Sequence, residues 1–476
     1  MNTRNSVANT TCPKTVMAGS LRTACASRLL TLLLLVLSVL AVKADQYGDF
    51  SYSTDGTNVT ITQYTGPGGE VTIPSTILVS GVSLPVISIG GSAFYFYNGL
   101  TSVTIPDSIT SIGINAFVAS GLTNVLIPDG VNYLGDGAFS GCSNLISVTI
   151  GNGVTNTGRG TFMLCVNLAT VTIPNSVTVI GANAFTQCFG LASVTIPESV
   201  TDIGQNAFAG CTGLNTISIG NGVTSIEMSA FYGCTNLTNI TIPDGVTSIG
   251  LNAFNQCTSL TNITIPNSVT NIGDGVFAYC TSLARIAIPS RVTNIGGDTF
   301  GHCTSLASIS IASGISRIPD YMFTGCTNLS SITFPQSVIW FGDGVFNGCT
   351  ALTNIYFNGN APKPSGGPWS EGTLATNYYL PGTTGWSTTF GGAPTAFWFL
   401  PNPLILTFEP NFGVQTNGFN FTISWATNVS IVVEACTNLA GTWTPLQSVS
   451  LTNGSFSFND PQWTNYPGRF YRLRSP

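Results

Sequence analysis

Ten cysteines recur along this 476-residue chain, and their residue numbers rise by a constant step of 23. They are Cys142, Cys165, Cys188, Cys211, Cys234, Cys257, Cys280, Cys303, Cys326 and Cys349. Thiols in such number could form disulfides, which are common in exported proteins, or hold a metal ion. A metal site would need clustered cysteines or histidine partners. The chain has a single histidine, and no cysteine cluster is visible.

The spacing of these cysteines argues for a structural role. If each interval is one turn of a stacked structure, neighbouring turns lie about 4.8 Å apart and their side chains point in parallel directions. A disulfide needs Cβ atoms about 3.8 Å apart and inclined toward each other. We therefore expect buried, reduced cysteines that fill space. Disulfides between adjacent turns and a metal site are the alternatives.

The remaining ionisable groups do not assemble a catalytic site. His302 lies between Gly301 and a repeating cysteine, which favours a surface or capping role. Four carboxylates follow a proline at a place where other turns have asparagine, so turn chemistry accounts for them. They are Asp107, Asp129, Glu198 and Asp244. A shallow Ca²⁺ site along that row is the alternative. Because the sequence pattern indicates no nucleophile–base pair, we predict neither enzymatic activity nor a cofactor.

Phenylalanines follow the same period, and only the step from Phe117 to Phe139 is shorter by one. They stand at 117, 139, 162, 185, 208, 231, 254, 277, 300, 323 and 346. The full unit reads L-x-x-V/I-x-I-P-x-x-V-x-x-I-G-x-x-A-F-x-x-C-x-x-L, and eleven units fill residues 100–351. Aromatic side chains repeated once per unit are expected to stack in a core.

Each unit can be interpreted as one turn of a solenoid. In the unit at 237, Ile240 and Ile242 alternate with Asn239 and Thr241, which predicts a strand with one buried side. Pro243 begins a turn, and a second short extended stretch follows. Later apolar residues recur at intervals of three and four residues, which suggests that the chain returns through a helical, 3-10 or irregular segment. A single turn cannot bury its apolar side alone, whereas a stack can.

The repeating unit resembles the BspA-like class of leucine-rich repeats, found in secreted and surface-attached bacterial proteins. The resemblance covers about residues 71–357 and rests on the recurring I-P, I-G, A-F and C-x-x-L pairs. It implies a leucine-rich-repeat solenoid of short parallel strands. It also implies adhesion to host or neighbouring-cell proteins.

Segments outside the array have other compositions. Residues 1–44 hold basic residues, then the apolar run Leu29–Val42 and a small-residue cleavage pattern ending at Ala44, which predicts a signal peptide. An uncleaved anchor is the alternative. The run is shorter than the roughly 20 residues of a membrane helix, so we expect no span in the mature chain. Without the leader, eight basic residues face nineteen acidic ones, a formal charge of −11. That charge disfavours nucleic acid as a partner.

The other boundaries follow from the repeat pattern. Residues 45–99 are expected to form an N-terminal cap with a degenerate repeat. Residues 352–402 contain a last partial repeat, a cap and a linker. Alternating aromatic and small polar residues between 403 and 476 predict a small β-sandwich-like domain.

A partner surface is most easily placed on the outward side of the first strands. Asn239, Thr241, Asn262 and Thr264 belong to two files of small hydroxyl and amide side chains. Arg285 replaces a small residue in one file, Arg291 and Arg317 fall on adjoining turns, and Tyr356 follows farther on. Arginine and tyrosine are enriched in binding hot spots.

These observations support two principal hypotheses. The first is a secreted or outer-surface bacterial protein that binds an extracellular or cell-surface protein through its strand face. The second is a passive structural or envelope scaffold without a specific ligand. A flat surface for ordered water or a glycan is a third possibility, although Leu126 and Arg285 interrupt the files.

Overall fold

In the computed structural model, the described residues are 45–365, 375–398, 404–407, 412–424, 429–451 and 454–474. They contain a β-solenoid, as the repeat pattern predicted, and a small all-β domain, as the alternation after the array predicted. The predicted signal peptide, residues 1–44, lies outside the described residues. No helix among the described residues is long and apolar enough to cross a membrane.

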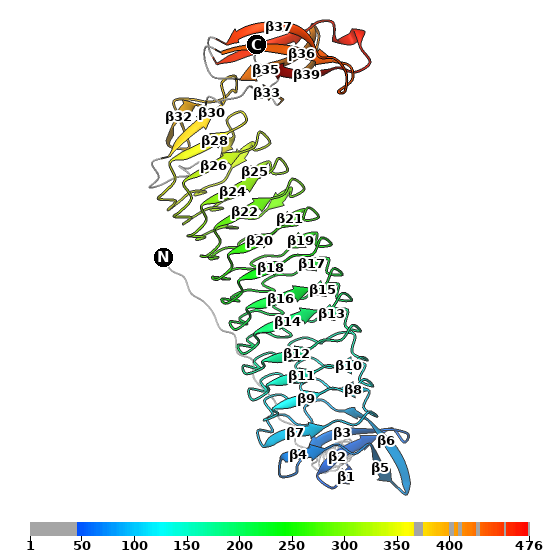
Figure 1. Ribbon diagram of the computed structural model, residues 1–476. Helices are drawn as coiled ribbons and strands as arrows, with labels where there is room; N and C mark the ends of the chain where they lie inside the picture. The colour runs from blue at the N-terminus through cyan, green and yellow to red at the C-terminus, as the bar shows by residue number, and fades with distance from the viewer. Residues whose placement is uncertain are drawn as a thin grey trace, which may run out of the picture. The chain divides into compact units, whose positions relative to one another are not determined.

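Most solenoid turns contribute a strand to each of two rows, which are visible as two columns in Figure 1. The turn after β11 has only an isolated bridge at Asn156 in the second row. The first row contains parallel strands with outward polar and inward apolar residues. Its strands are β4 (Gly69–Thr72), β7 (Leu100–Thr104), β9 (Asn124–Leu126), β11 (Ser147–Thr149), β12 (Thr170–Thr172), β14 (Ser193–Ile196), β16 (Thr216–Ile219), β18 (Asn239–Thr241), β20 (Asn262–Thr264), β22 (Arg285–Ile288), β24 (Ser308–Ile311), β26 (Ser331–Phe334), β28 (Asn354–Phe357), β30 (Thr376–Tyr379) and β32 (Ala393–Phe397).

The second row is built from parallel strands of two residues each, apart from the longer first strand β6. They are β6 (Val82–Ile89), β8 (Ser111–Ile112), β10 (Tyr133–Leu134), β13 (Val179–Ile180), β15 (Asp202–Ile203), β17 (Ser225–Ile226), β19 (Ser248–Ile249), β21 (Asn271–Ile272), β23 (Asn294–Ile295), β25 (Arg317–Ile318), β27 (Trp340–Phe341) and β29 (Lys363–Pro364). The proline turn between the rows is closed by a hydrogen bond, as where the Val246 N–H donates to the Pro243 carbonyl at 3.1 Å. Val246 and Ile249 are both fully buried.

The return from the second row to the next first-row strand is irregular, and the described solenoid residues form no helix there. In every turn, the residues two before and two after the core phenylalanine have positive φ, between 51° and 75°. Those before it are Ser92, Asn115, Gly137, Gly160, Asn183, Asn206, Ser229, Asn252, Gly275, Asp298, Tyr321 and Gly344. Those after it are Phe96, Ala119, Gly141, Leu164, Gln187, Gly210, Gly233, Gln256, Tyr279, His302, Gly325 and Gly348. A helix cannot continue through such left-handed residues.

Hydrogen bonds of the return alternate between the turn itself and its neighbour. The Asn255 N–H donates to Asn252 of its own turn at 3.1 Å, whereas the Phe254 N–H donates to Val276 of the next turn at 2.9 Å. Backbone groups that a helix would pair internally therefore join adjacent turns, which ties the return to the stack.

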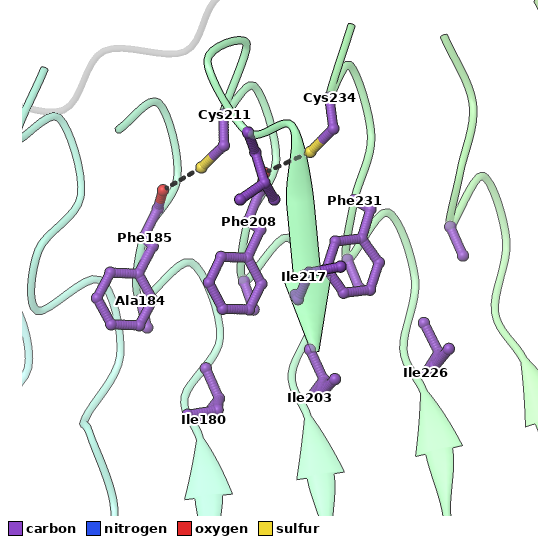
Figure 2. Packing of buried hydrophobic residues seen from close by; sticks show 14 of the residues in the cluster. Ile180, Ala184, Phe185, Ile203, Phe208, Cys211, Ile217, Ile226, Phe231 and Cys234 are labelled. Carbon is purple, nitrogen blue, oxygen red and sulfur yellow. Dashed lines mark hydrogen bonds between the residues drawn. The ribbon is translucent and has the colours of Figure 1, made fainter. Parts of the chain in front are cut away.

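The core is a column of phenylalanine rings that runs from Phe94 to Phe346. Neighbouring rings stack with centroids 4.7–5.8 Å apart and planes within 12° of parallel. Figure 2 shows Phe185, Phe208 and Phe231 in this arrangement, with isoleucines of the second row beside them. One period of sequence thus supplies one layer of core.

Both ends of the column are covered by aromatic residues. At the N-terminal end, β2 (Phe50–Thr54) pairs antiparallel with β3 (Val59–Tyr64), and the Tyr64 ring stacks on Phe94 at 5.3 Å. The hairpin of β5 (Thr76–Val79) and β6 lies in this cap, after β1 (Asp45–Tyr47) and β2. At the other end, Trp386 packs against Phe357 at 4.9 Å. The first row continues there through β30 and β32, which pairs with β31 (Thr389–Phe390).

The C-terminal domain consists of two antiparallel sheets around one core. One contains β33 (Leu404–Leu406), β34 (Gly413–Gln415), β35 (Gly418–Ser424) and β38 (Ser455–Asp460). The other contains β36 (Val429–Cys436), β37 (Thr444–Leu451) and β39 (Phe470–Arg474), and a 3-10 turn, η1, spans Trp463–Asn465. Phe421 and Ile423 of one sheet share a core with Ile431 and Val433 of the other. A small all-β domain was predicted here.

Candidate functional site

The outward side of the first row carries the polar files predicted from the sequence. Asn239 stands in register with Asn262, and Thr241 with Thr264; all four are exposed. The buried isoleucines between them belong to the core. The alternation of a strand therefore presents the amides and hydroxyls to solvent.

A shallow groove of about 790 Å³ runs along this face between β20 and β24. Its lining includes Asn262 and Thr264 of β20, Arg285 of β22 and Ser310 of β24. Asp244, from one of the proline turns, lines the groove as well. The groove therefore lies where the strand face meets the row of turns, and both supply polar groups.

Two further grooves occupy the same position earlier in the stack. One of about 690 Å³ is lined by Asp107, Asp129 and Thr149, and another of about 350 Å³ by Thr170, Asn175 and Thr195. Neither has a basic residue in its lining. Arg285 therefore distinguishes the groove between β20 and β24 from these two.

Two of the four turn carboxylates bond to the next turn. Asp129 accepts the Asn152 N–H at 2.8 Å, and Glu198 accepts the Asn221 N–H at 2.6 Å. Such bonds satisfy backbone donors between turns, which is the role expected of acidic residues in turns. Among the described residues, no three metal-ligating side chains gather in one place.

The three arginines fall on different parts of their turns. Arg285 faces outward from β22, and Arg291 is exposed in the following turn. Arg317 begins β25 in the second row, where its guanidinium carbon lies 3.7 Å from the centroid of the Trp340 ring. The structure thus places Arg285 in the first-row groove and Arg317 on the other row. A smaller groove on the second row is lined by Arg317, and Arg291 lines neither groove.

Tyr356 lies on the first row, three turns beyond Arg285 and roughly 14 Å along the stack at the usual strand spacing. Its ring stacks against Tyr378 at 5.2 Å and packs beside Trp398 at 4.6 Å. The Asn354 side chain donates to its hydroxyl at 3.0 Å. Tyr356 therefore belongs to an aromatic cluster at the end of the row, away from the groove that holds Arg285.

The ten cysteines are buried and free of disulfides. Each thiol donates to a phenylalanine carbonyl on the preceding turn, with sulfur–oxygen distances of 3.0–3.3 Å. Figure 2 shows this bond between Cys211 and Phe185. Burial raises the pKa of Cys211 and Cys257 to about 12, so both remain protonated thiols near neutral pH. A protonated, enclosed thiol is a poor nucleophile and a poor metal ligand.

His302 has a left-handed backbone conformation in the return segment and stacks on Tyr279 at 4.6 Å. A Cβ added to Gly325 would approach the His302 ring to 2.5 Å, so a glycine on the next turn makes room for the imidazole. Burial raises the pKa of the nearby Asp298 carboxyl, although the charge of His302 partly opposes this shift.

Sequence reasoning missed Trp340 and Lys363, which stand in register with Arg317 on the second row. A signal was available. The turns at Ser225, Ser248, Asn271 and Asn294 have small polar residues at the same position, and only Tyr133 is also aromatic among the earlier second-row strands from β8 on, so a tryptophan there stands out. Tyr378 and Trp398 were missed because the repeat pattern ends before them.

Comparison with known proteins places the solenoid in a family. The model of the BspA type leucine rich repeat region matches in six copies, over residues 75–192, 178–304 and 270–365, which together exceed half of the chain. The chain belongs to this family of leucine-rich-repeat proteins. No curated protein matches the chain.

Two solved structures illustrate the relationship. A leucine rich cell surface protein from Faecalibacterium prausnitzii is 31% identical; the match covers 68% of this chain and 96% of that one, with a TM-score of 0.46. A leucine-rich repeat protein from Bacteroides ovatus is 26% identical, with coverage of 70% and 94% and a TM-score of 0.50. This chain is similar to both over about two thirds of its length.

Proposed function

We propose that this protein is secreted or displayed on a bacterial surface, and that it binds an extracellular protein through the first-row groove between β20 and β24. The observation that carries the proposal is Arg285. It is an exposed cation in a groove whose other lining residues are apolar or neutral polar, apart from Asp244.

The physical setting of Arg285 favours binding. Within the described solenoid residues no ion pair reaches this guanidinium, so its charge and planar donors are available to a partner. The neighbouring amides and hydroxyls offer hydrogen bonds without further charge. The family relationship and the cell-surface relative support the location, and solenoids commonly bind partners along such faces.

The test is a comparison of charge-reversal variants. Partners captured from extracellular and surface proteins by the full chain are identified, purified and titrated against wild type and Arg285→Glu. We expect the affinity to fall at least tenfold, because a hot-spot charge is reversed, while the melting temperature stays nearly unchanged. The double variant with Arg291→Glu tests whether the adjoining turn contributes.

Arg159→Glu is the matched control, since Arg159 is an exposed arginine in the return segment of a distant turn. Equal loss of affinity in both variants would indicate a general charge effect. Unaltered capture by Arg285→Glu would contradict the proposal. The absence of any saturable partner would instead support a passive scaffold, in which the array acts as a spacer.

A further inference from the structure

We propose that Arg317, Trp340 and Lys363 form a second binding site, which takes an acidic, extended segment of a protein partner. The three residues stand in register on β25, β27 and β29. This site goes beyond the function proposed above, because it lies on the second row and uses none of the residues of the first-row groove.

The tryptophan fixes the position of the arginine. The Arg317 guanidinium carbon lies 3.7 Å from the Trp340 ring centroid, which is the geometry of a cation–π contact. Such stacking occupies the flat face of the guanidinium. The N–H groups lie in the guanidinium plane, so they remain available for a carboxylate. Lys363 lies on the next turn beyond Trp340 and adds a second cation.

Both cations are exposed, and neither forms an ion pair with a described residue. The ion pairs of the described residues involve Arg469, Arg472 and Arg474, all in the C-terminal domain. Arg317 and Lys363 are two of only eight basic residues after position 44, in a segment with nineteen acidic ones. A local positive pair on an acidic protein attracts a negatively charged group.

A groove beside Arg317 extends the site. Asn271, Asn294 and Arg317 line about 550 Å³ of open space on the second row. Asp274 also lines it, but its carboxylate already accepts the Gly297 N–H at 2.8 Å. The groove therefore offers amide groups next to the guanidinium.

The spacing of the cations selects the shape of the ligand. Arg317 and Lys363 lie two turns apart, or about 10 Å at the usual strand spacing, and three residues of extended peptide span the same length. In the polyproline II conformation side chains repeat their direction every three residues, so acidic residues at every third position of such an extended segment would meet both cations. The site is less suited to binding a sugar ring by stacking, because Arg317 already covers one face of the Trp340 indole. Nucleic acid is disfavoured by the net charge.

The test uses a fluorescein-labelled ten-residue peptide with glutamate at every third position among serines and threonines. Its binding to the full chain is followed by fluorescence anisotropy, with a glutamine-substituted peptide as the ligand control. We expect Arg317→Gln and Lys363→Gln each to weaken binding about tenfold, and Trp340→Leu to weaken it because Arg317 loses its support. Arg159→Gln, which changes an exposed arginine in the return segment of a distant turn, should bind like wild type.

Several results would overturn this inference. Failure of the glutamate peptide to bind, or equally tight binding of it by wild type and Arg317→Gln, contradicts the proposal. So does an equal loss of binding in Arg159→Gln. Tighter, Arg317-dependent binding of polygalacturonate or of a DNA duplex would assign the site to a glycan or a nucleic acid instead. If Arg285→Gln alone weakens peptide binding, the second-row site fails while the first-row proposal stands. Melting temperatures of all variants confirm that each remains folded.

Discussion

Each ladder cysteine joins two turns through its thiol. The Phe231 carbonyl accepts the Cys234 N–H of its own turn at 3.2 Å and the Cys257 thiol of the next turn at 3.3 Å. Both lone pairs of a buried carbonyl are thus used, although a single partner already satisfies a buried polar atom. A valine or alanine would fill the space without supplying this donor. Ser120 stands at the corresponding place in the first full unit, where its hydroxyl contacts the Cys142 thiol at 3.2 Å.

The buried thiols predict a loss of stability at alkaline pH. Burial raises the pKa of Cys211 in the folded chain to about 12, against an ordinary value of 9.0. Above pH 9 the unfolded chain releases the thiol proton while the folded chain retains it, so the free energy of unfolding falls as the pH rises toward 12. The expected cost is about 1.4 kcal/mol per such thiol for each pH unit in that window.

Urea unfolding under reducing conditions between pH 7.5 and 10.5 measures this effect. Cys211→Ala should be less stable than wild type at pH 7.5, because it loses a buried donor. Its free energy of unfolding should then fall less steeply with pH, because one ionising thiol is missing. Equal slopes for the two chains would contradict the assignment of the decline to thiol ionisation.

At this scale the sequence predicts which side of the chain a residue occupies. Alternation assigned Asn239 outward and Ile240 inward, and the structure agrees. It could not predict that Arg285 and Arg317 face different surfaces. The repeat shows that both are outward, but the direction of each depends on the angle between the two rows, which comes from packing of the whole turn.

At the scale of the element, the return segment departs from the simplest interpretation of its sequence. Apolar residues spaced three and four residues apart also occur in a helix. That spacing made one helical turn one of the predicted forms of the return. The left-handed residues two before and two after each phenylalanine prevent it. Their composition gave a clue, because glycine, asparagine, aspartate and serine predominate at the first of these positions, and glycine and asparagine tolerate this conformation best.

Gly233 tests the left-handed position directly. Its φ is 68°, and an added Cβ would meet no atom closer than 3.8 Å, so only the backbone conformation opposes a side chain. We expect Gly233→Ala to lower the free energy of unfolding by about 1 kcal/mol, measured in urea. Gln256 holds the same position one turn later with a φ of 62°. Gln256→Ala should be nearly neutral there, because both residues bear the same backbone cost. A neutral Gly233→Ala would show that the position is not held left-handed in solution.

At the scale of the whole molecule, the repeating unit of sequence is also the unit of stability. Core rings, thiols and return hydrogen bonds all connect one turn to the next. The sequence predicted this array because the pattern repeats so often. It could not predict that the first row continues through β30 and β32. The sequence around Tyr378 and Tyr379 does not follow the repeat pattern. Pairing of β30 with β28 and aromatic packing hold these strands in place instead.

Deletion of whole units separates a binding protein from a spacer. Removing residues 189–211 or 281–303 takes out one full period and joins a ladder cysteine to the threonine of a later turn, so the C-x-x-L sequence is restored at both junctions. Both variants should remain folded with similar melting temperatures, because stability in repeat proteins is approximately a sum over turns and their interfaces. Removing only residues 200–211, a fraction of one period, should unfold much of the array, since register between neighbouring turns is lost.

The two full-unit deletions should differ in binding. Loss of 281–303 removes Arg285 and Arg291 and should abolish capture of the partner identified with wild type, whereas loss of 189–211 leaves the groove intact and should preserve it. Circular dichroism and titration of that partner measure both outcomes. If the two chains capture the partner equally, the first-row groove is not the binding site, and a scaffold in which the repeats set only length becomes the better account.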